Sequence, residues 1–161
     1  MRKAVGILLA LILLSSCSDN AVFSNSTSFS NGWKLQDTVQ VQLPVLDSVT
    51  NYDLFLTVRN SNDYPFNNLF LIVAMEFPQG KVITDTLEYR MANPDGSWMG
   101  TGVGSIKESK LWYKEGVRFL EGGNYKLSIV HALRNNGQLG GVEDLQGILE
   151  VGLRIEESGK E

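Results

Sequence analysis

The sequence predicts an all-β protein, an antiparallel β-sandwich of seven to eight strands that follows an N-terminal leader and a short tether. Three observations lead to this fold. Apolar and polar residues alternate with period two in several segments of 33–156, clusters of turn-forming residues separate these segments, and no segment has a convincing helical period. Short alternating strands joined by tight turns are typical of antiparallel sandwiches.

The leader covers residues 1–16. Two basic residues, Arg2 and Lys3, precede an unbroken apolar run over 5–14, and the sequence Leu-Ser-Ser-Cys then ends at Cys17. This is the layout of a secretory signal peptide, and the run is far shorter than the roughly 20 residues that a membrane-spanning helix needs. A leucine and two small residues before a cysteine also form a bacterial lipobox, in which the thiol is alkylated by diacylglycerol.

We therefore expect a cleaved lipoprotein signal peptide, with lipidation at Cys17. The alternative is a plain signal peptide with an incidental cysteine. The lipobox is favoured because the chain has one cysteine, and it stands at the lipobox position. Residues 17–32 are rich in Ser and Asn with scattered apolar groups, so they are expected to form the lipidated end and a tether.

The first half of the domain contains four expected strands. Segments 33–43 and 52–59 alternate apolar and polar residues, as half-buried strands do. Segment 69–75 is continuously apolar and bounded by Pro and Gly, which favours a central strand over a helix. Segment 81–92 alternates again and ends at the strong Asn-Pro-Asp-Gly turn.

The second half begins with a glycine-rich stretch and continues as strands. Segment 106–120 has a composition that permits a helix, but it lacks a clean 3.6 period and contains a glycine, so we favour a strand. Alternating strands are expected at 125–133 and 148–155. The β-sandwich domain is thus predicted to span 33–156, with a charged tail at 157–161.

Charge and cysteine content limit the function classes. Removal of Arg2 and Lys3 with the leader leaves 12 of the 14 basic residues against 18 acidic ones, a net charge near −6. This balance argues against nucleic acid or an anionic membrane surface as a partner, because both attract basic patches. With Cys17 acylated no thiol remains, which excludes disulfides and cysteine–metal sites. We expect no cofactor.

Residues with catalytic potential are few. His131 is the only histidine and shares the core-facing parity of its strand, so a buried structural histidine is favoured over a catalytic one. Asp85 with Glu88, or Glu143 with Asp144, could form the carboxylate pair of a glycosidase. Neither pair carries a distinguishing motif, and solvated surface charge is the preferred interpretation. We expect a protein that is not an enzyme.

The stretch 97–104 has glycine at alternate positions and is the candidate interaction surface. It lacks the Gly-Lys-Ser/Thr ending of a phosphate-binding loop, and no amphipathic helix follows it. We instead expect the alternate glycines to expose backbone that another chain or an aromatic ring can approach. We predict that Trp98, Gly100 and Gly102 form this surface, with Trp98 partly exposed. The tryptophans and tyrosines could instead line a carbohydrate site or fill the core.

The residue after the lipidated cysteine indicates the destination. Position 18 is Ser rather than an acid, although Asp19 follows it, and no dense acidic run is present. An acid directly after the cysteine retains many lipoproteins in the inner membrane, and dense acidic runs accompany surface display in Bacteroidota. We therefore expect a lipid-anchored protein of the outer membrane that faces the periplasm.

Short motifs across the domain resemble those of a known family. Besides the lipobox they are Asn68-Leu69-Phe70-Leu71, Phe77-Pro78-Gln79-Gly80, Asp85-Thr86-Leu87-Glu88-Tyr89, Gly96-Ser97-Trp98-Met99-Gly100-Thr101-Gly102, Gly123-Asn124-Tyr125 and Gly152-Leu153-Arg154-Ile155. Together they resemble the GldH family of gliding-motility lipoproteins of Bacteroidota.

The resemblance implies a non-enzymatic cell-envelope lipoprotein of the gliding machinery, which is tied to type IX secretion. Members also occur in bacteria that do not glide, so a role in assembling or stabilising an envelope protein complex would be common to all. The implied partners are the membrane, through the lipid anchor, and other envelope proteins of a motility or secretion complex. The alternative hypothesis is a surface glycan-binding lipoprotein, suggested by the three tryptophans and the loop 96–104.

Overall fold

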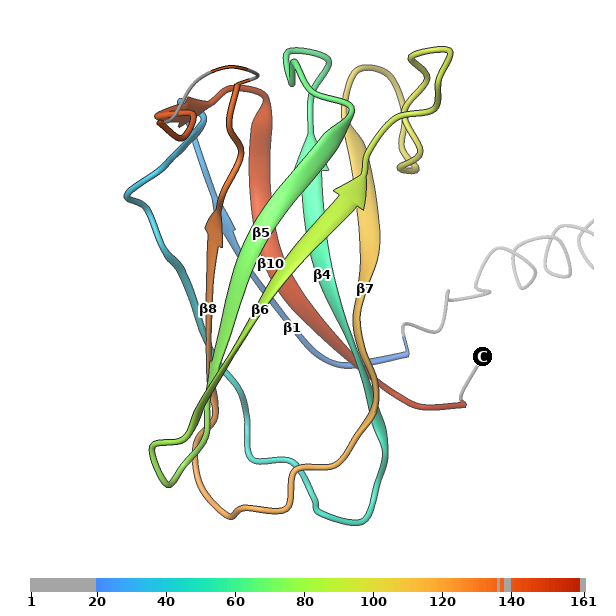
Figure 1. The fold of residues 1–161 in the computed structure, drawn as a ribbon. Coiled ribbons are helices and arrows are strands. Elements are labelled where there is room, and N and C mark those ends of the chain that lie inside the picture. Colours follow the sequence, from blue (N-terminus) through green and yellow to red (C-terminus); the bar gives the residue numbers. More distant parts are fainter. Residues whose placement is uncertain (1–19, 136, 138–139, 160–161) are drawn as a thin grey trace, which may run out of the picture.

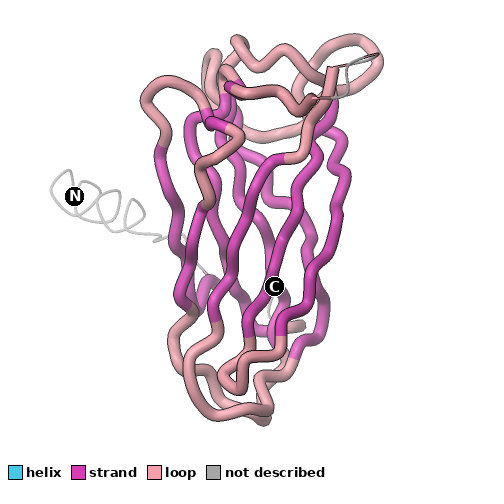
Figure 2. Tube along the Cα trace, turned by 60° about the vertical axis from the view of Figure 1, so that its left-hand side comes forward, coloured by secondary structure: helices cyan, strands magenta, loops and turns pink. Residues whose placement is uncertain are grey.

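A computed structural model describes residues 20–135, 137 and 140–159 of the chain. The described residues contain strands and no helix, and the strands form two four-stranded antiparallel sheets that pack face to face (Figures 1 and 2). One sheet has the order β1 (Ala21–Ser28), β10 (Ile148–Glu157), β4 (Tyr52–Asn60) and β7 (Lys107–Val117). The other has the order β3 (Val39–Gln42), β8 (Lys126–His131), β5 (Asn68–Glu76) and β6 (Val82–Arg90).

The predicted antiparallel β-sandwich is thereby confirmed. The segment for which a helix was the alternative, 106–120, forms β7. The continuously apolar segment forms β5, which lies inside its sheet between β8 and β6. A third, two-stranded sheet pairs β2 (Trp33–Lys34) with β9 (Asp144–Leu145). Among the residues that the structure describes, no helix has the length and hydropathy required to cross a bilayer.

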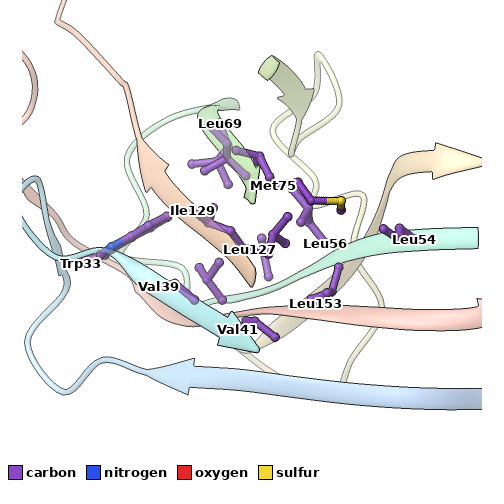
Figure 3. Close-up of a cluster of buried hydrophobic side chains, with 14 of the residues drawn as sticks. Trp33, Val39, Val41, Leu54, Leu56, Leu69, Met75, Leu127, Ile129 and Leu153 are labelled. Carbon is purple, nitrogen blue, oxygen red and sulfur yellow. The ribbon is translucent and has the colours of Figure 1, made fainter. Parts of the chain in front are cut away.

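The core lies between the two large sheets. Alternate residues of each strand point into it, as period two requires, and Figure 3 shows this layer. Removing one such aliphatic side chain from water contributes about 1.5–3 kcal/mol. Fully buried members include Leu54, Leu56 and Leu153 from one sheet and Leu69, Leu127 and Ile129 from the other. Trp33 is also fully buried, and its indole N–H donates to the carbonyl of Asp37 at 2.8 Å.

The structure corrects the predicted tether over 17–32, because residues 21–28 of this segment form β1. This strand pairs with β10 from Ala21 opposite Glu156 to Ser28 opposite Glu150. An edge strand is held by backbone hydrogen bonds, so its Ser and Asn side chains can remain in water while Phe23 packs against the core. A side chain at Gly152 would overlap the carbonyl of Asn25, so glycine on β10 permits the close approach.

Two further boundaries differ from the prediction. The expected strand 33–43 is divided into β2 and β3, which belong to different sheets, because the chain turns where the N–H of Asp37 donates to the carbonyl of Lys34. The charged tail was expected from 157, but β10 includes Glu157, and the N–H of Ser158 donates to the carbonyl of Asn51. The folded domain therefore begins at β1 and extends past the predicted limits of 33–156.

The loops gather at two ends of the sandwich. In Figure 1 the segments 43–51, 77–81 and 118–125 lie at the bottom and are called here the lower end. The segments 61–67 and 91–106, with the described residues between β8 and β10, lie at the top and are called the upper end. The strand β1 starts on the side of the lower end.

Candidate functional site

The predicted interaction surface lies at the upper end, in the loop 91–106 that joins β6 to β7. Its first turn is closed by the N–H of Gly96, which donates to the carbonyl of Asn93 at 3.0 Å, and Gly96 has φ 84°. Asp95 accepts hydrogen bonds from the Ser97 N–H at 2.9 Å and the Ser97 hydroxyl at 2.6 Å. These bonds hold the pKa of Asp95 below its usual value. The loop therefore starts as a tightly bonded turn.

The glycines of this loop allow close packing within the chain itself. A Cβ at Gly100 would lie 2.7 Å from the hydroxyl oxygen of Ser109 and 2.8 Å from the carbonyl oxygen of Glu108. Gly102 has φ 144°, and a Cβ there would lie 2.5 Å from the carbonyl oxygen of Ile106. The predicted close approach is thus made by β7 and its lead-in segment. Contact with another protein at Gly100 and Gly102 stays a prediction.

Trp98 is partly buried and held in place by neighbouring side chains. Its indole N–H donates to the side-chain oxygen of Asn62 at 3.0 Å, and its ring lies 6.1 Å from the ring of Tyr64. Its partial exposure agrees with the expectation, yet its polar group already has a partner inside the chain. The indole N–H and the ring of Trp98 therefore both stabilise the loops of the upper end.

Trp112 on β7 is the most exposed of the three tryptophans, at 56%. Its ring lies 4.3 Å from that of Phe55, which points out of the sandwich yet is only 3% exposed. Lys110 lies over the same Phe55 ring at 4.1 Å. Sequence reasoning did not single out Trp112. The signal was its parity with Lys110 and Lys114, which places it on the outer face of a strand.

The edges β6 and β7 are joined by polar side chains. The Tyr89 hydroxyl donates to the carbonyl of Trp112 at 2.6 Å, and the Tyr113 hydroxyl donates to Asp85 at 3.0 Å. Lys114 pairs with Asp85 at 2.8 Å and holds the pKa of that carboxyl below its usual value. Burial, in turn, raises the pKa of Tyr89 to about 12. These contacts join the two edge strands along this side of the sandwich.

The outer face of the β5–β8 pair carries an apolar stripe, defined by Ile72, Ala74, Val130 and Ala132. Ile72, Ala74 and Val130 alternate with core residues along their strands, Ala132 directly follows β8, and Ile72 lies opposite Val130. All four are half-buried, and threonines, serine and glutamine surround them on the neighbouring strands. A solvated sheet face is normally polar. An apolar centre with a polar rim is instead typical of a protein contact surface.

His131 ends β8 and is buried beside Trp33, with the two ring centroids 5.1 Å apart. Its burial agrees with the structural role that the sequence suggested. Neither ring nitrogen has a hydrogen-bond partner among the described residues, and burial lowers the pKa of His131. The ring is therefore a neutral part of the packing under the upper end.

The candidate carboxylate pairs are engaged in local structure. Asp85 bonds to β7, whereas Glu88 accepts a hydrogen bond from the Asn68 side chain at 2.8 Å. The Asp144 carboxylate accepts from Gln146 at 2.7 Å, beside a shallow hollow of about 430 Å³ that Glu143 also lines. Within the part of the chain that the structure describes, no group of three potential metal ligands is found. Cys17 and the leader 1–16 lie outside the described residues.

Comparison with known proteins places this domain. The profile of the GldH lipoprotein family matches residues 21–155, which is nearly the whole sandwich from β1 to β10. The chain belongs to the GldH lipoprotein family. The match begins where β1 begins, which supports the inclusion of this strand in the domain.

Two curated members of the family are similar over almost their full length. The gliding motility lipoprotein GldH of Flavobacterium johnsoniae is 54% identical over 151 residues, covering 94% of each chain. A protein described as a gliding motility lipoprotein GldH homolog, from Christiangramia forsetii, is 49% identical over 161 residues, covering 98% of this chain and 99% of its own. The family establishes a membrane-anchored lipoprotein of the cell envelope that is associated with gliding motility.

Among solved structures, the VP2 subviral particle of infectious bursal disease virus is similar to 87% of this chain with 15% identity. The TM-score is 0.38, and the match spans 34% of the viral chain. A likeness this weak supports no conclusion about function.

Proposed function

We propose that this GldH-family protein is a non-enzymatic component of the gliding and type IX secretion machinery that helps assemble or stabilise an envelope protein complex. Family membership and the apolar stripe on the outer face of β5 and β8 support this role. The stripe is the observation that carries the proposal, because an apolar centre with a polar rim on the outer face of a sheet is typical of a protein contact surface.

The anchor is the second part of the proposal. Lipidation of Cys17 attaches the mature chain to the outer membrane on its periplasmic side. One acyl chain binds a bilayer reversibly and two signals bind it stably, at about 0.8 kcal/mol per buried methylene, so a fully acylated cysteine is a permanent anchor. The membrane and other envelope proteins are then the partners, with no nucleic acid among them.

Substitutions on the stripe test the proposed contact with other proteins. Val130→Lys and Ile72→Lys place a charge at its centre, where a partner would have to desolvate it, so the set of co-purifying envelope proteins should be lost. Thr84→Lys is the matched control, because Thr84 lies opposite Ala74 on the exposed edge strand β6. The measurement is affinity purification of the lipidated protein from its native envelope, followed by mass spectrometry.

Two outcomes separate the possibilities. If the control keeps its partners while Val130→Lys loses them, the stripe is the contact face. If Val130→Lys keeps the whole set, the assembly role must use another surface and the argument from the stripe fails. Circular dichroism of each variant shows whether the sandwich remains folded.

A second function, glycan binding, is favoured by one observation, the exposed Trp112 ring beside polar side chains. Carbohydrates stack on such rings while charged and hydroxyl groups bind their edges. A glycan array probed with wild type and Trp112→Ala tests it. Binding that Trp112→Ala abolishes would support it, and an array without signal for the wild type would exclude it for the sugars present.

A further inference from the structure

The lower end of the sandwich exposes three aliphatic side chains, Val45, Val49 and Leu120. Their exposed fractions are 76%, 82% and 69%. Val45 and Val49 belong to the loop 43–51 and Leu120 to the loop 118–125, and Figure 1 shows these two segments together at the bottom of the molecule. A cluster of this kind marks contact with another molecule or with a membrane.

The loop that carries the two valines is well ordered. The carboxylate of Asp47 accepts hydrogen bonds from the backbone N–H groups of Val49 at 2.9 Å and Thr50 at 2.7 Å. It also accepts one from the hydroxyl of Tyr52 at 2.7 Å. Asp47, the only acid of the loop 43–51, is thus turned toward the backbone of its own loop. Because the loop is already ordered, the valines can bind another surface without a further loss of conformational entropy in the loop.

A hollow of about 340 Å³ lies between the two loops, and apolar groups form much of its wall. The rings of Phe119 and Tyr125, which meet edge to face at 4.9 Å, contribute to it, as does Leu46. The three exposed side chains also line this hollow. The lower end is therefore a concave apolar surface with projecting aliphatic groups.

Charge does not oppose a membrane contact at this end. The three loops of the lower end carry two basic side chains, Lys81 and Arg118, and two acidic ones, Asp47 and Glu121, so they have no net charge. The mature chain as a whole is acidic, which would disfavour approach to an anionic bilayer through most of its surface. The lower end, with no net charge, does not share this electrostatic repulsion.

The start of the chain brings this end within reach of a bilayer. Ala21 lies opposite Glu156, and Glu156 opposite Asp53, so β1 begins in the row just above the loop 43–51. Four residue steps separate Ala21 from Cys17, and an extended chain covers at most about 14 Å in that distance. From Ala21, β1 runs away from the lower end toward the upper end over about 23 Å. The anchored end of the chain is therefore closer to the lower end than to the upper end.

We propose that Val45, Val49 and Leu120 insert into the headgroup–acyl boundary of the bilayer that holds the lipid anchor. This inference depends on the lipidation of Cys17 proposed above. The domain then has two attachments, the acyl chains and its own lower end, and stands with the upper end directed away from the membrane. The outer stripe of β5 and β8 is left free along the side of the upright sandwich.

Spin labels at single introduced cysteines test the contact. Acylated Cys17 offers no thiol, so Val49→Cys and Leu120→Cys can each be labelled with a nitroxide. Val103→Cys is the matched control, because Val103 is 97% exposed and belongs to the upper end. The lipidated proteins are reconstituted, without any other protein, in liposomes of phosphatidylethanolamine and phosphatidylglycerol. Collision rates with oxygen, which enters the bilayer, are compared with those of a water-soluble nickel complex.

The expected result is an oxygen-to-nickel ratio several-fold higher at positions 49 and 120 than at 103. Equal, water-like ratios at all three positions, in protein whose mature N-terminus carries the acyl chains by mass spectrometry, would overturn the inference while leaving the anchor intact. If the labels at 49 and 120 lose contact with the nickel complex only after an envelope protein is added, the lower end binds a protein, and the proposed lipid contact is overturned as well. A mature N-terminus without lipid would refute the anchor and the lipid contact together.

Discussion

The two ends of the sandwich use their loops differently. At the upper end, loop backbone is packed against the chain itself, and glycines such as Gly100 and Gly147 stand where a side chain would collide with it. At the lower end the loops are short, ordered by Asp47, and have aliphatic side chains that point to solvent. The glycine-rich stretch that looks like an external surface in the sequence is thus packed on its own chain at Gly100 and Gly102, although Met99 and Val103 beside these glycines remain exposed.

The largest expected effect contrasts one glycine from each end. Gly147 has φ 78°, and a Cβ there would overlap the backbone of Tyr64, so Gly147→Ala should lower the free energy of unfolding by about 3 kcal/mol or more. Gly80 has φ 85° but open space around it, and Gly80→Ala should cost only about 1 kcal/mol. Urea denaturation of the two variants measures this. Equal losses would show that the upper end is not packed as described.

The next effect concerns the acids that order each end. Asp47 accepts three hydrogen bonds, including one from Tyr52, whereas Asp95 accepts two from Ser97. Asp47→Ala should therefore destabilise the domain more than Asp95→Ala, though less than Gly147→Ala does. Denaturation of both variants at pH 7 gives the comparison, and a reversed order would contradict it.

The same pair predicts a pH dependence. These hydrogen bonds hold the pKa of both carboxyls below the usual value, so their contribution is complete above about pH 4. It is lost as the pH falls through the lowered pKa values. The stability difference between wild type and Asp47→Ala should accordingly shrink on acidification, and a difference that grows would be inconsistent with the bonds described.

A smaller effect is the pH dependence of stability that comes from His131, which is buried beneath the upper end. Burial lowers the pKa of His131 beneath the upper end, more than the nearby Asp144 carboxylate raises it. The unfolded chain then binds the proton more readily than the native one, so stability is complete above about pH 6.5 and falls as the pH drops below it. His131→Leu should remove this slope. Thermal unfolding from pH 7.5 to 5 measures it, and an unchanged slope in the variant would assign the effect elsewhere.

The smallest effect concerns Trp98. Trp98→Phe keeps a ring near Tyr64 but removes the N–H that donates to Asn62, which should cost about 1 kcal/mol. Asn62→Ala should cost a similar amount, and the double variant little more than either alone. Fully additive losses in this double-mutant cycle would mean that the hydrogen bond does not form in solution.

Much of the fold was readable from the sequence because the signals were local. The apolar run of β5 is continuous since the strand has Leu71 and Val73 in the core and Ile72 in the outer stripe, and this pattern predicted a central strand. β1 was missed because its pairing uses backbone groups, and the glycine that admits it, Gly152, lies on a strand more than a hundred residues away.

The candidate surfaces were harder to predict from the sequence, because the solvent exposure of a loop side chain depends on how the loop folds. Leu46 and Val49 are both aliphatic residues of one turn segment, yet Leu46 packs against the core and Val49 points to solvent. Nothing in their spacing distinguishes them. For the tryptophans, parity with Lys110 and Lys114 indicates the outer face for Trp112, but the sequence contains no signal for the hydrogen bond from Trp98 to Asn62 that holds the Trp98 ring in place.

Hydrogen–deuterium exchange tests the contrast between the two ends most directly. The lipidated protein in liposomes is compared with a chain that starts at residue 18 and has no anchor. Slower exchange in the lipidated protein is expected in 43–51 and 118–125, where the lower end meets the bilayer, with unchanged exchange in 91–106. Protection confined to 91–106, or equal at both ends, would contradict a domain that stands on its lower end.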